Sequence, residues 1–287
     1  MRPIELHSKE GINYIRKKYG FHNTKSLGQN FLADRGVIEA IVNAAEIQPS
    51  DLVIEIGPGL GVLTVLEAEQ AGKVFAIELD RDLIPILHDL LSPFPNVEII
   101  HADILKTDIP ALIERADCSG VKIIGNLPYY ITTPIIMYLL ENKIPADSIT
   151  IMLQKEVAER IMASPGSRTY GALSVAVQYY ADVKHIIDVP SHMFVPAPKV
   201  DSTVLRLDLR DKPPIEVKDE KFFFNIVKAG FGQRRKTLLN SLSGAGIAPN
   251  KETLKLCLKQ SGIDGTRRAE TLSLEEFARL ADALHND

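Results

Sequence analysis

The four residues Asn126-Leu127-Pro128-Tyr129 have the chemistry of a clamp for a planar, hydrogen-bonding ring. They follow the short apolar run 121–125, which is typical of a buried strand. The Asn amide offers one acceptor oxygen and two donor hydrogens, and Tyr129 offers a flat face on which a nucleobase can stack. Pro128 fixes its own φ and biases Leu127 toward an extended backbone. The exocyclic amine of adenine is the group that most needs such a clamp, although a strained strand-to-helix turn would also explain the four residues.

A glycine-rich turn lies upstream, between a predicted strand at 51–56 and a predicted helix from residue 62. Its sequence is Gly57-Pro-Gly59-Leu-Gly61. Glycines at such a turn let the backbone approach a ligand closely. The turn is not the dinucleotide fingerprint, because the third glycine that this pattern needs is replaced by Val62.

Acidic residues end the next two predicted strands. Glu78 closes the run 73–78, where a carboxylate can accept hydrogen bonds from both hydroxyls of a ribose. Asp103 closes the run 97–103 and could accept from an adenine amine. Each acid alone could instead be a helix N-cap. Together with Gly57 and Asn126 they fall at the C-terminal ends of successive strands, where open α/β sheets bind their ligands, so the series predicts a nucleoside site.

The order of elements predicts an α/β domain followed by a helical one. A helix is expected over 36–47, and strand and helix signals then alternate to about residue 160, which implies a mostly parallel sheet with helices on both faces. The stretch 170–189 is expected to be a helix and then a strand, and 203–209 alternates as a last strand. A linker at 211–215 precedes a helical region with an N-cap at Asn250 and a capping box at 273–276. The predicted domains are therefore 1–210 and 211–287.

Composition is typical of a cytoplasmic globular protein, with 45% hydrophobic and 24% charged residues. No apolar run has the length of a membrane span, and the N-terminus lacks the apolar core of a signal peptide. Cys118 and Cys257 lie far apart and match no metal-binding spacing, so neither a metal nor a disulfide is expected.

The charge is unevenly distributed although its net value is −4. Residues 1–25 carry six Lys/Arg against two Glu, and residues 221–259 carry eight Lys/Arg against one Glu. This asymmetry indicates a basic surface for a polyanion, in which Arg234, Arg235 and Lys236 are the candidate RNA-binding residues. Solvated helix faces are the alternative explanation for each basic cluster.

The chain resembles the ribosomal RNA adenine dimethyltransferases over nearly its whole length. Five segments carry the resemblance: KSLGQNFL at 25–32, EIGPGLG at 55–61, NLPY at 126–129, FVPAPKVDS at 194–202 and FGQRRKTLL at 231–239. The last two resemble the bacterial small-subunit branch, which dimethylates N6 of two adjacent adenines in a hairpin loop near the 3′ end of 16S rRNA. Tyr130 and Gly232 depart from the family's pattern.

The resemblance implies a Rossmann-like fold, S-adenosylmethionine as cofactor, and the 16S rRNA of the immature small subunit as partner of a monomeric enzyme. It implies that the cofactor is bound by Asn30, Leu32, Gly57, Gly59, Glu78, Asp103 and Asn126. The target adenine would be flipped into the pocket, with its amine bound by Asn126 and the Leu127 carbonyl and its faces covered by Tyr129 and Phe194. No general base would be needed.

Three other functions were weighed against this one. The erythromycin-resistance enzymes methylate large-subunit RNA and share the Asn-Pro-Tyr clamp, but they match the segments that begin at 194 and 231 less well. A nicotinamide dehydrogenase would use the same sheet and Glu78 but would need the missing glycine. A non-catalytic ribosome assembly factor would use the basic helices alone.

Overall fold

The structure, a computed structural model, describes residues 7–23 and 28–285. The chain forms two compact units, Met1–Ala158 with Asp182–Leu209, and Glu159–Ala181 with Arg210–Asp287. The first three residues of the expected 25–32 motif lie outside the described residues.

The elements over 35–162, at 172–189 and at 202–209 follow the order expected from the sequence, whereas the helix at 9–19 and the short strands at 31–32 and 194–195 were not predicted. The helices and strands are α1 (Lys9–Tyr19), β1 (Phe31–Leu32), α2 (Arg35–Ala45), β2 (Asp51–Ile56), α3 (Val62–Ala68), β3 (Lys73–Glu78), α4 (Ile84–Leu90), β4 (Val97–His101), η2 (Ile104–Lys106), α5 (Ile109–Ala116), β5 (Gly120–Asn126), α6 (Thr132–Glu141), β6 (Ser148–Gln154), α7 (Lys155–Met162), α8 (Ala172–Tyr180), β7 (Ala181–Val189), η3 (Ser191–Met193), β8 (Phe194–Val195), β9 (Ser202–Leu209), α9 (Glu220–Phe231), α10 (Leu238–Gly244), α11 (Lys251–Gln260), η4 (Ala269–Thr271) and α12 (Leu274–His285).

The first unit is built on a seven-stranded sheet in the order β4-β3-β2-β5-β6-β9-β7. Strands β2 to β6 pair in parallel, and β9 pairs antiparallel with β6. Every residue of β2 is buried, which explains why its sequence is an apolar run and not an alternating one. The predicted α/β fold with a mostly parallel sheet is confirmed.

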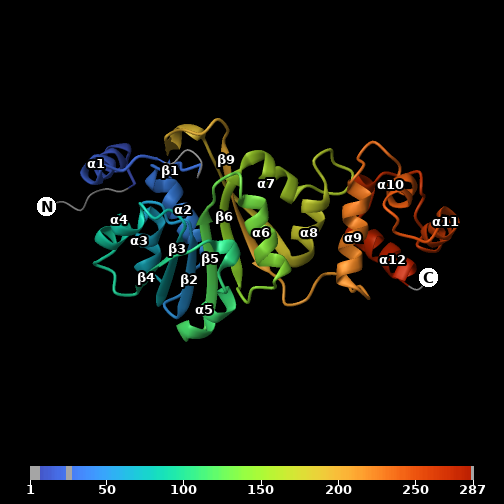
Figure 1. The fold of residues 1–287 in the computed structure, drawn as a ribbon, viewed down its shortest axis with the longest axis horizontal. Helices are drawn as coiled ribbons and strands as arrows, with labels where there is room; N and C mark the ends of the chain where they lie inside the picture. The colour runs from blue at the N-terminus through green and yellow to red at the C-terminus, as the bar shows by residue number, and fades with distance from the viewer. Residues whose placement is uncertain (1–6, 24–27, 286–287) are drawn as a thin grey trace. The chain divides into compact units, whose positions relative to one another are not determined.

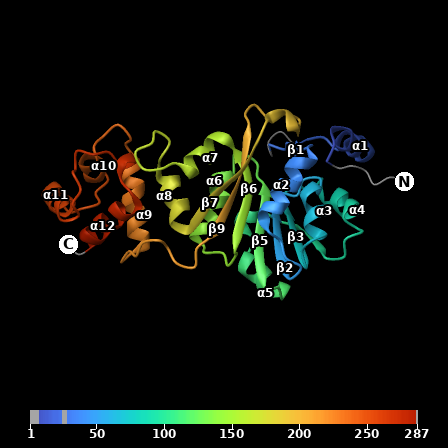
Figure 2. The same ribbon diagram turned by 180° about the vertical axis from the view of Figure 1, so that it is seen from behind.

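Helices cover both faces of this sheet, as Figures 1 and 2 show from opposite sides. Helix α2 begins where the Asp34 carboxylate accepts from the amide of Val37 at 3.0 Å. Its apolar side packs with α3 against Val53, Val74 and neighbouring sheet residues in one core cluster. Helix α6 lies on the opposite face.

A small antiparallel pair, β1 with β8, joins two segments that are far apart in the sequence. Phe31 lies opposite Val195, and Leu32 lies opposite Phe194. Two of the five family segments are thereby brought together beside the main sheet.

The second unit is helical and has its own core. Asn250 caps α11 by accepting from the amide of Thr253 at 2.8 Å. Ser273 and Glu276 form the reciprocal hydrogen bonds of a capping box, at 2.9 and 3.3 Å. Both predicted helix starts are confirmed.

The division between the units differs from the predicted boundary at 210. The unit that holds α9 to α12 also holds residues 159–181, because Tyr170 and Tyr179 are buried in the same core as Phe223 and Phe277. The sequence could not show this, since the partners of Tyr170 and Tyr179 lie some forty or more residues further along the chain. The assignment of separate functions to 1–210 and 211–287 stays a prediction.

Candidate functional site

The C-terminal ends of four adjacent parallel strands line one pocket. Asp103, Glu78, Gly57 and Asn126 follow or end β4, β3, β2 and β5, which is the order of these strands across the sheet. The pocket is open to solvent, and its empty space amounts to about 1100 Å³ when the adjoining solvent is counted. The structure therefore brings together the four residues that the sequence singled out as a series.

The glycine-rich turn at 57–61 forms the floor of the pocket. Gly57, Gly59 and Gly61 have φ values of 69°, 59° and 75°, a region that other residues rarely adopt. A Cβ atom built on Gly57 would meet no heavy atom within 4 Å, whereas one built on Gly59 would lie 3.2 Å from the Phe31 ring. The backbone at Gly57 is thus open to a ligand, while Gly59 leaves room for Phe31.

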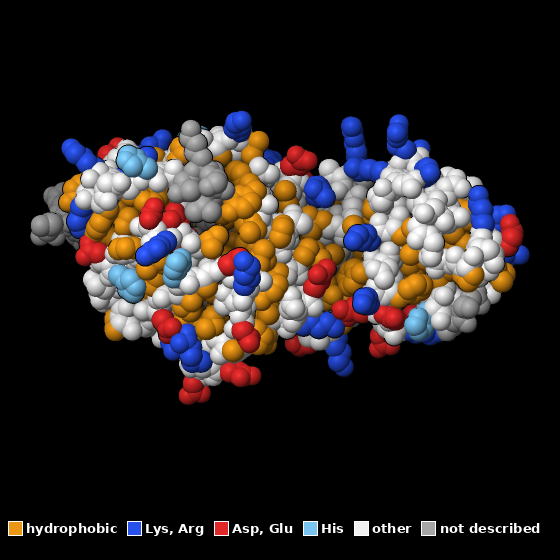
Figure 3. Space-filling model, in the orientation of Figure 1, with side chains coloured by type: hydrophobic (Ala, Val, Ile, Leu, Met, Phe, Trp, Pro, Cys, Tyr) orange, Lys and Arg blue, Asp and Glu red, His pale blue; other side chains and the backbone are white. Residues whose placement is uncertain are grey.

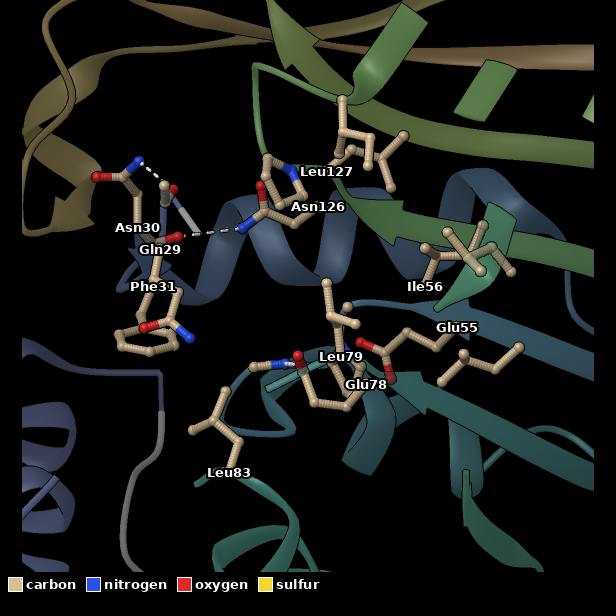
Figure 4. Close-up of a pocket in the computed structure, with 18 of the residues that line it drawn as sticks. Gln29, Asn30, Phe31, Glu55, Ile56, Glu78, Leu79, Leu83, Asn126 and Leu127 are labelled. Atoms are coloured by element: carbon tan, nitrogen blue, oxygen red, sulfur yellow. Dashed lines mark hydrogen bonds between the residues drawn. The ribbon is translucent and has the colours of Figure 1, made fainter. Parts of the chain in front are cut away.

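Glu78 holds a buried carboxylate that the backbone orients. Its Oε1 accepts from the amide of Asp80 at 2.8 Å, and its Oε2 accepts from the amide of Gly59 at 3.2 Å. Burial raises the pKa of this carboxyl, and the two amides act against that increase. Figure 4 shows the side chain on the side of the pocket that lies across from Asn126.

Asp103 caps the short helix η2, which is the alternative that the sequence left open, and it also lines the pocket. Its Oδ1 accepts from the amide of Leu105 at 3.1 Å and so caps η2. Its Oδ2 lies 3.5 Å from the Nζ atom of Lys106, whose side chain is largely exposed and can move. The same carboxylate lines the pocket.

The turn that follows β5 contributes Asn126 and Leu127 to the lining of the pocket. The Asn126 Nδ2 group donates to the carbonyl oxygen of Asn30 at 3.4 Å, a contact drawn in Figure 4. The amide of Leu127 donates to Met152 at 3.3 Å, and the carbonyl of Pro128 accepts from α6 residues. Within the part of the chain that the structure describes, no hydrogen bond engages Asn126 Oδ1 or the carbonyl oxygen of Leu127.

Tyr129 and Phe194 both line the pocket but differ in exposure. Tyr129 is partly buried, its hydroxyl lies 2.6 Å from the Ser202 hydroxyl, and burial raises its pKa. Phe194 is 3% exposed and belongs to the core beneath β8. Covering both faces of one base with these two rings stays a prediction.

The segment 28–32 closes the remaining side of the pocket. Asn30 donates from its Nδ2 to the carbonyl of Gly28 at 3.0 Å, and Leu32 is buried. Gln29 donates to the Asp80 carboxylate at 2.5 Å and thereby ties this segment to the turn after Glu78. The sequence analysis did not single out Gln29, because its partner lies about fifty residues away.

A buried acidic pair lies beneath the glycine-rich turn and was also missed. Glu55 on β2 and Glu67 on α3 are almost fully buried, and the Thr64 hydroxyl donates to Glu55. Burial raises the pKa of Glu55 to about 7 and raises that of Glu67 well above its usual value. Glu55 also lines the pocket. The signal in the sequence was an acid inside an otherwise apolar strand.

The three basic residues Arg234, Arg235 and Lys236 lie in the exposed turn between α9 and α10 of the second unit. Figure 3 shows Lys and Arg side chains protruding around this part of the unit. Arg234 is partly engaged, since its Nη2 donates to the carbonyl of Arg168 and its Nε lies 3.9 Å from Glu270.

Residues 7–23 and 28–285 contain no group of three or more His, Cys, Asp or Glu placed to hold a metal ion. No helix in these ranges is both long and apolar enough to span a membrane.

Known proteins resemble the chain over most of its length. The "Ribosomal RNA small subunit methyltransferase A" of Shouchella clausii is 52% identical over 277 residues, covering 96% of this chain and 94% of that protein. The protein of the same name from Clostridioides difficile is 51% identical, covering 98% and 97%.

Two solved structures share the fold. A dimethyladenosine transferase from Plasmodium falciparum has a TM-score of 0.76 and 27% identity, covering 87% of this chain and 95% of that one. The 23S rRNA methyltransferase ErmE has a TM-score of 0.68 and 29% identity, covering 89% and 100%. Residues 20–286 match the family described as ribosomal RNA adenine dimethylase, and the chain belongs to that family.

Proposed function

We propose that this S-adenosylmethionine-dependent rRNA adenine dimethylase acts on the small ribosomal subunit. In this proposal it dimethylates N6 of two adjacent adenines in a hairpin loop near the 3′ end of 16S rRNA. The relatives named small-subunit methyltransferases, at 51–52% identity, support this substrate over the large subunit. The observation that supports the chemistry is that Asn126 and Leu127 both line the pocket from one turn, and that no hydrogen bond among the described residues occupies Asn126 Oδ1 or the carbonyl oxygen of Leu127.

The residues of the pocket fit S-adenosylmethionine. A carboxylate has about four acceptor positions, and the amides of Asp80 and Gly59 bind one to each oxygen of Glu78, so the carboxylate can still accept from the ribose hydroxyls. Asp103 would accept from the adenine amine of the cofactor. Gly57 leaves the turn open at the backbone, Gly59 would bind from the same turn, and Asn30, Leu32 and Asn126 would line the methionine end.

The cofactor supplies an activated methyl group, and the protein positions the acceptor amine. The two N6 hydrogens of the target adenine would be bound by Asn126 Oδ1 and by the carbonyl oxygen of Leu127. These bonds draw the nitrogen lone pair out of conjugation with the ring and direct it along the line of methyl transfer. The Nδ2 bond to Asn30 fixes which end of the amide faces the substrate. Catalysis then comes from positioning and placed acceptors, and no general base is required.

Tyr129 would hold one face of the target base by stacking, and Phe194 the other. The Ser202 hydroxyl keeps the Tyr129 ring in place through its 2.6 Å contact with the phenol oxygen. Arg234, Arg235 and Lys236 would bind phosphates of the same RNA. The finer expectations of a monomeric enzyme, of an immature subunit as substrate and of a cytoplasmic location belong to this proposal.

The test is methyl transfer from labelled S-adenosylmethionine to immature small subunits and, in parallel, to large-subunit RNA. The proposal expects label in dimethyladenosine from the small-subunit RNA. Label in large-subunit RNA would support the ErmE-like alternative, which rests on the 0.68 TM-score. Absence of label from both RNAs, with the particle still bound, would favour a non-catalytic assembly factor.

A further inference from the structure

Tyr130 is an aromatic residue held in an exposed position at the pocket. It comes directly after the Asn126–Tyr129 clamp, it lines the pocket, and it is 56% exposed. An exposed aromatic ring forgoes burial that would stabilise the fold. Neighbouring exposed apolar side chains mark binding surfaces, and Leu79, which is 45% exposed, lines the same pocket as Tyr130.

The Tyr130 ring lies close to Gly28, at the start of segment 28–32. A Cβ atom built on Gly28 would lie 3.6 Å from Tyr130 Cδ1 and 3.7 Å from its Cε1. Gly28 has a φ of 60°, so both its conformation and its lack of a side chain suit this contact. The Tyr130 ring therefore lies in the space that a side chain at residue 28 would need, while more than half of Tyr130 stays exposed.

Tyr129 and Tyr130 are not equivalent. The Tyr129 hydroxyl is bound to Ser202 and its side chain is partly buried, which places it with the clamp. The Tyr130 ring lies near Gly28 instead, and Tyr130 lines the same pocket.

Flipping a base out of its stack also exposes the base next to it. The enzyme must unstack the target adenine to reach its amine, so the adjoining nucleotide loses a stacking partner. A rigid aromatic ring beside the pocket can replace that partner without reading the base sequence.

We propose that Tyr130 is the stacking platform for the nucleotide that adjoins the target adenine. The inference rests on the proposed function, since it takes single-stranded RNA as the substrate. It assigns Tyr130 to substrate positioning, with no contact to the reacting atoms.

The first test compares Tyr130→Ala and Tyr130→Phe with Tyr14→Ala as a matched control, because Tyr14 is also exposed, at 50%, but lies on α1. We expect Tyr130→Ala to raise the KM for immature small subunits roughly 10-fold or more, the lower range of a lost base stack. Tyr130→Phe should stay near the parent value, and calorimetry should give all three variants the parent affinity for S-adenosylmethionine. A parent-like KM for Tyr130→Ala, or an equal loss for Tyr130→Phe, would overturn the proposal.

The second test removes the base instead of the ring. Particles are prepared with an abasic nucleotide next to the target adenine, and kcat/KM is measured for the parent and for Tyr130→Ala. If the Tyr130 ring stacks on that base, the effects of the two changes on kcat/KM are not additive. On the abasic particle, the kcat/KM of Tyr130→Ala is then only slightly lower than that of the parent enzyme. Additive losses would show that Tyr130 acts elsewhere. Failure of the parent enzyme to methylate any small-subunit particle would instead count against the proposed function.

Discussion

Asn126 has its amide group turned in a defined direction by the donation from Nδ2 to the carbonyl of Asn30. The acceptor Oδ1 is thereby left for the substrate, so Asn126→Ala should remove an acceptor that acts in the transition state. We expect the activation free energy of methyl transfer to rise by about 2–4 kcal/mol, which lowers the rate by roughly one and a half to three orders of magnitude, with the fold retained. Single-turnover transfer to the small subunit measures this. Asn142→Ala, which removes an exposed amide at the end of α6, is the matched control. Near-normal turnover in Asn126→Ala would exclude the proposed clamp.

Glu78 gives a second prediction for a single residue. Its carboxylate would bind the ribose hydroxyls through charge-assisted hydrogen bonds, so Glu78→Ala should weaken S-adenosylmethionine by about 1.5–3 kcal/mol, or roughly 10- to 150-fold. Calorimetry on the protein without RNA gives this number directly. Glu69→Ala, at the exposed end of α3, should bind like the parent protein. An unchanged affinity of Glu78→Ala for S-adenosylmethionine would show that Glu78 only stabilises the 57–61 turn.

At the scale of elements, β2 and α3 are joined by the buried pair Glu55 and Glu67. Both pKa values are raised by burial, so the folded state keeps protons that the unfolded chain releases. The stabilisation that these bound protons give is complete below the pKa of an unfolded-state glutamate, about 4.3. It is lost as the pH rises through the pKa values of the folded protein, and the pKa of Glu55 in the folded protein is about 7. Each proton held by the folded state alone gives a slope of about 1.4 kcal/mol per pH unit.

The substitution Glu67→Gln should flatten this pH dependence, because the amide stays neutral and can donate to Glu55. Urea unfolding at pH 5, 7 and 8.5 measures the free energy of unfolding at each pH. The free energy of unfolding of the variant should increase relative to that of the parent protein as the pH increases. Glu69→Gln is the control, since that side chain is exposed. Parallel stability curves for Glu67→Gln and the parent would show that Glu67 carries no proton of its own in this range.

The same elements show what the sequence could and could not predict. Strands β2, β3 and β5 and their polar ends were predictable, because a parallel sheet brings the C-terminal ends of its strands to one edge. The cap at Asn250 followed from local spacing. The Gln29–Asp80 contact and the pairing of β1 with β8 were not predictable, since they join distant segments that carry no periodic signal. The burial of Phe194 was missed for the same reason.

At the scale of the whole molecule, the charges are distributed between the two units. A protein with a net charge of −4 can still bind RNA if its cations gather where the RNA lies. The pocket lies in the first unit, and the turn with Arg234, Arg235 and Lys236 lies in the second. Changes in this turn should therefore affect RNA binding and leave cofactor binding alone.

The structure sharpens this last prediction by separating the three cations. Arg234 is already bound to the carbonyl of Arg168, whereas Arg235 and Lys236 are exposed in the same turn. Replacing Arg235 and Lys236 by Gln should flatten the dependence of log affinity on log salt by about 1.4–1.8, which corresponds to two phosphate contacts. Arg234→Gln alone should change the slope less than a single substitution of Arg235 or Lys236, because the Arg234 guanidinium already binds the carbonyl of Arg168 and lies near Glu270. Filter binding of small-subunit particles over a salt series measures the slopes, and calorimetry tests for unchanged S-adenosylmethionine affinity. Parallel salt lines for the double variant and the parent would make this turn an ordinary solvated surface, and a loss of cofactor affinity would show that it supports the first unit.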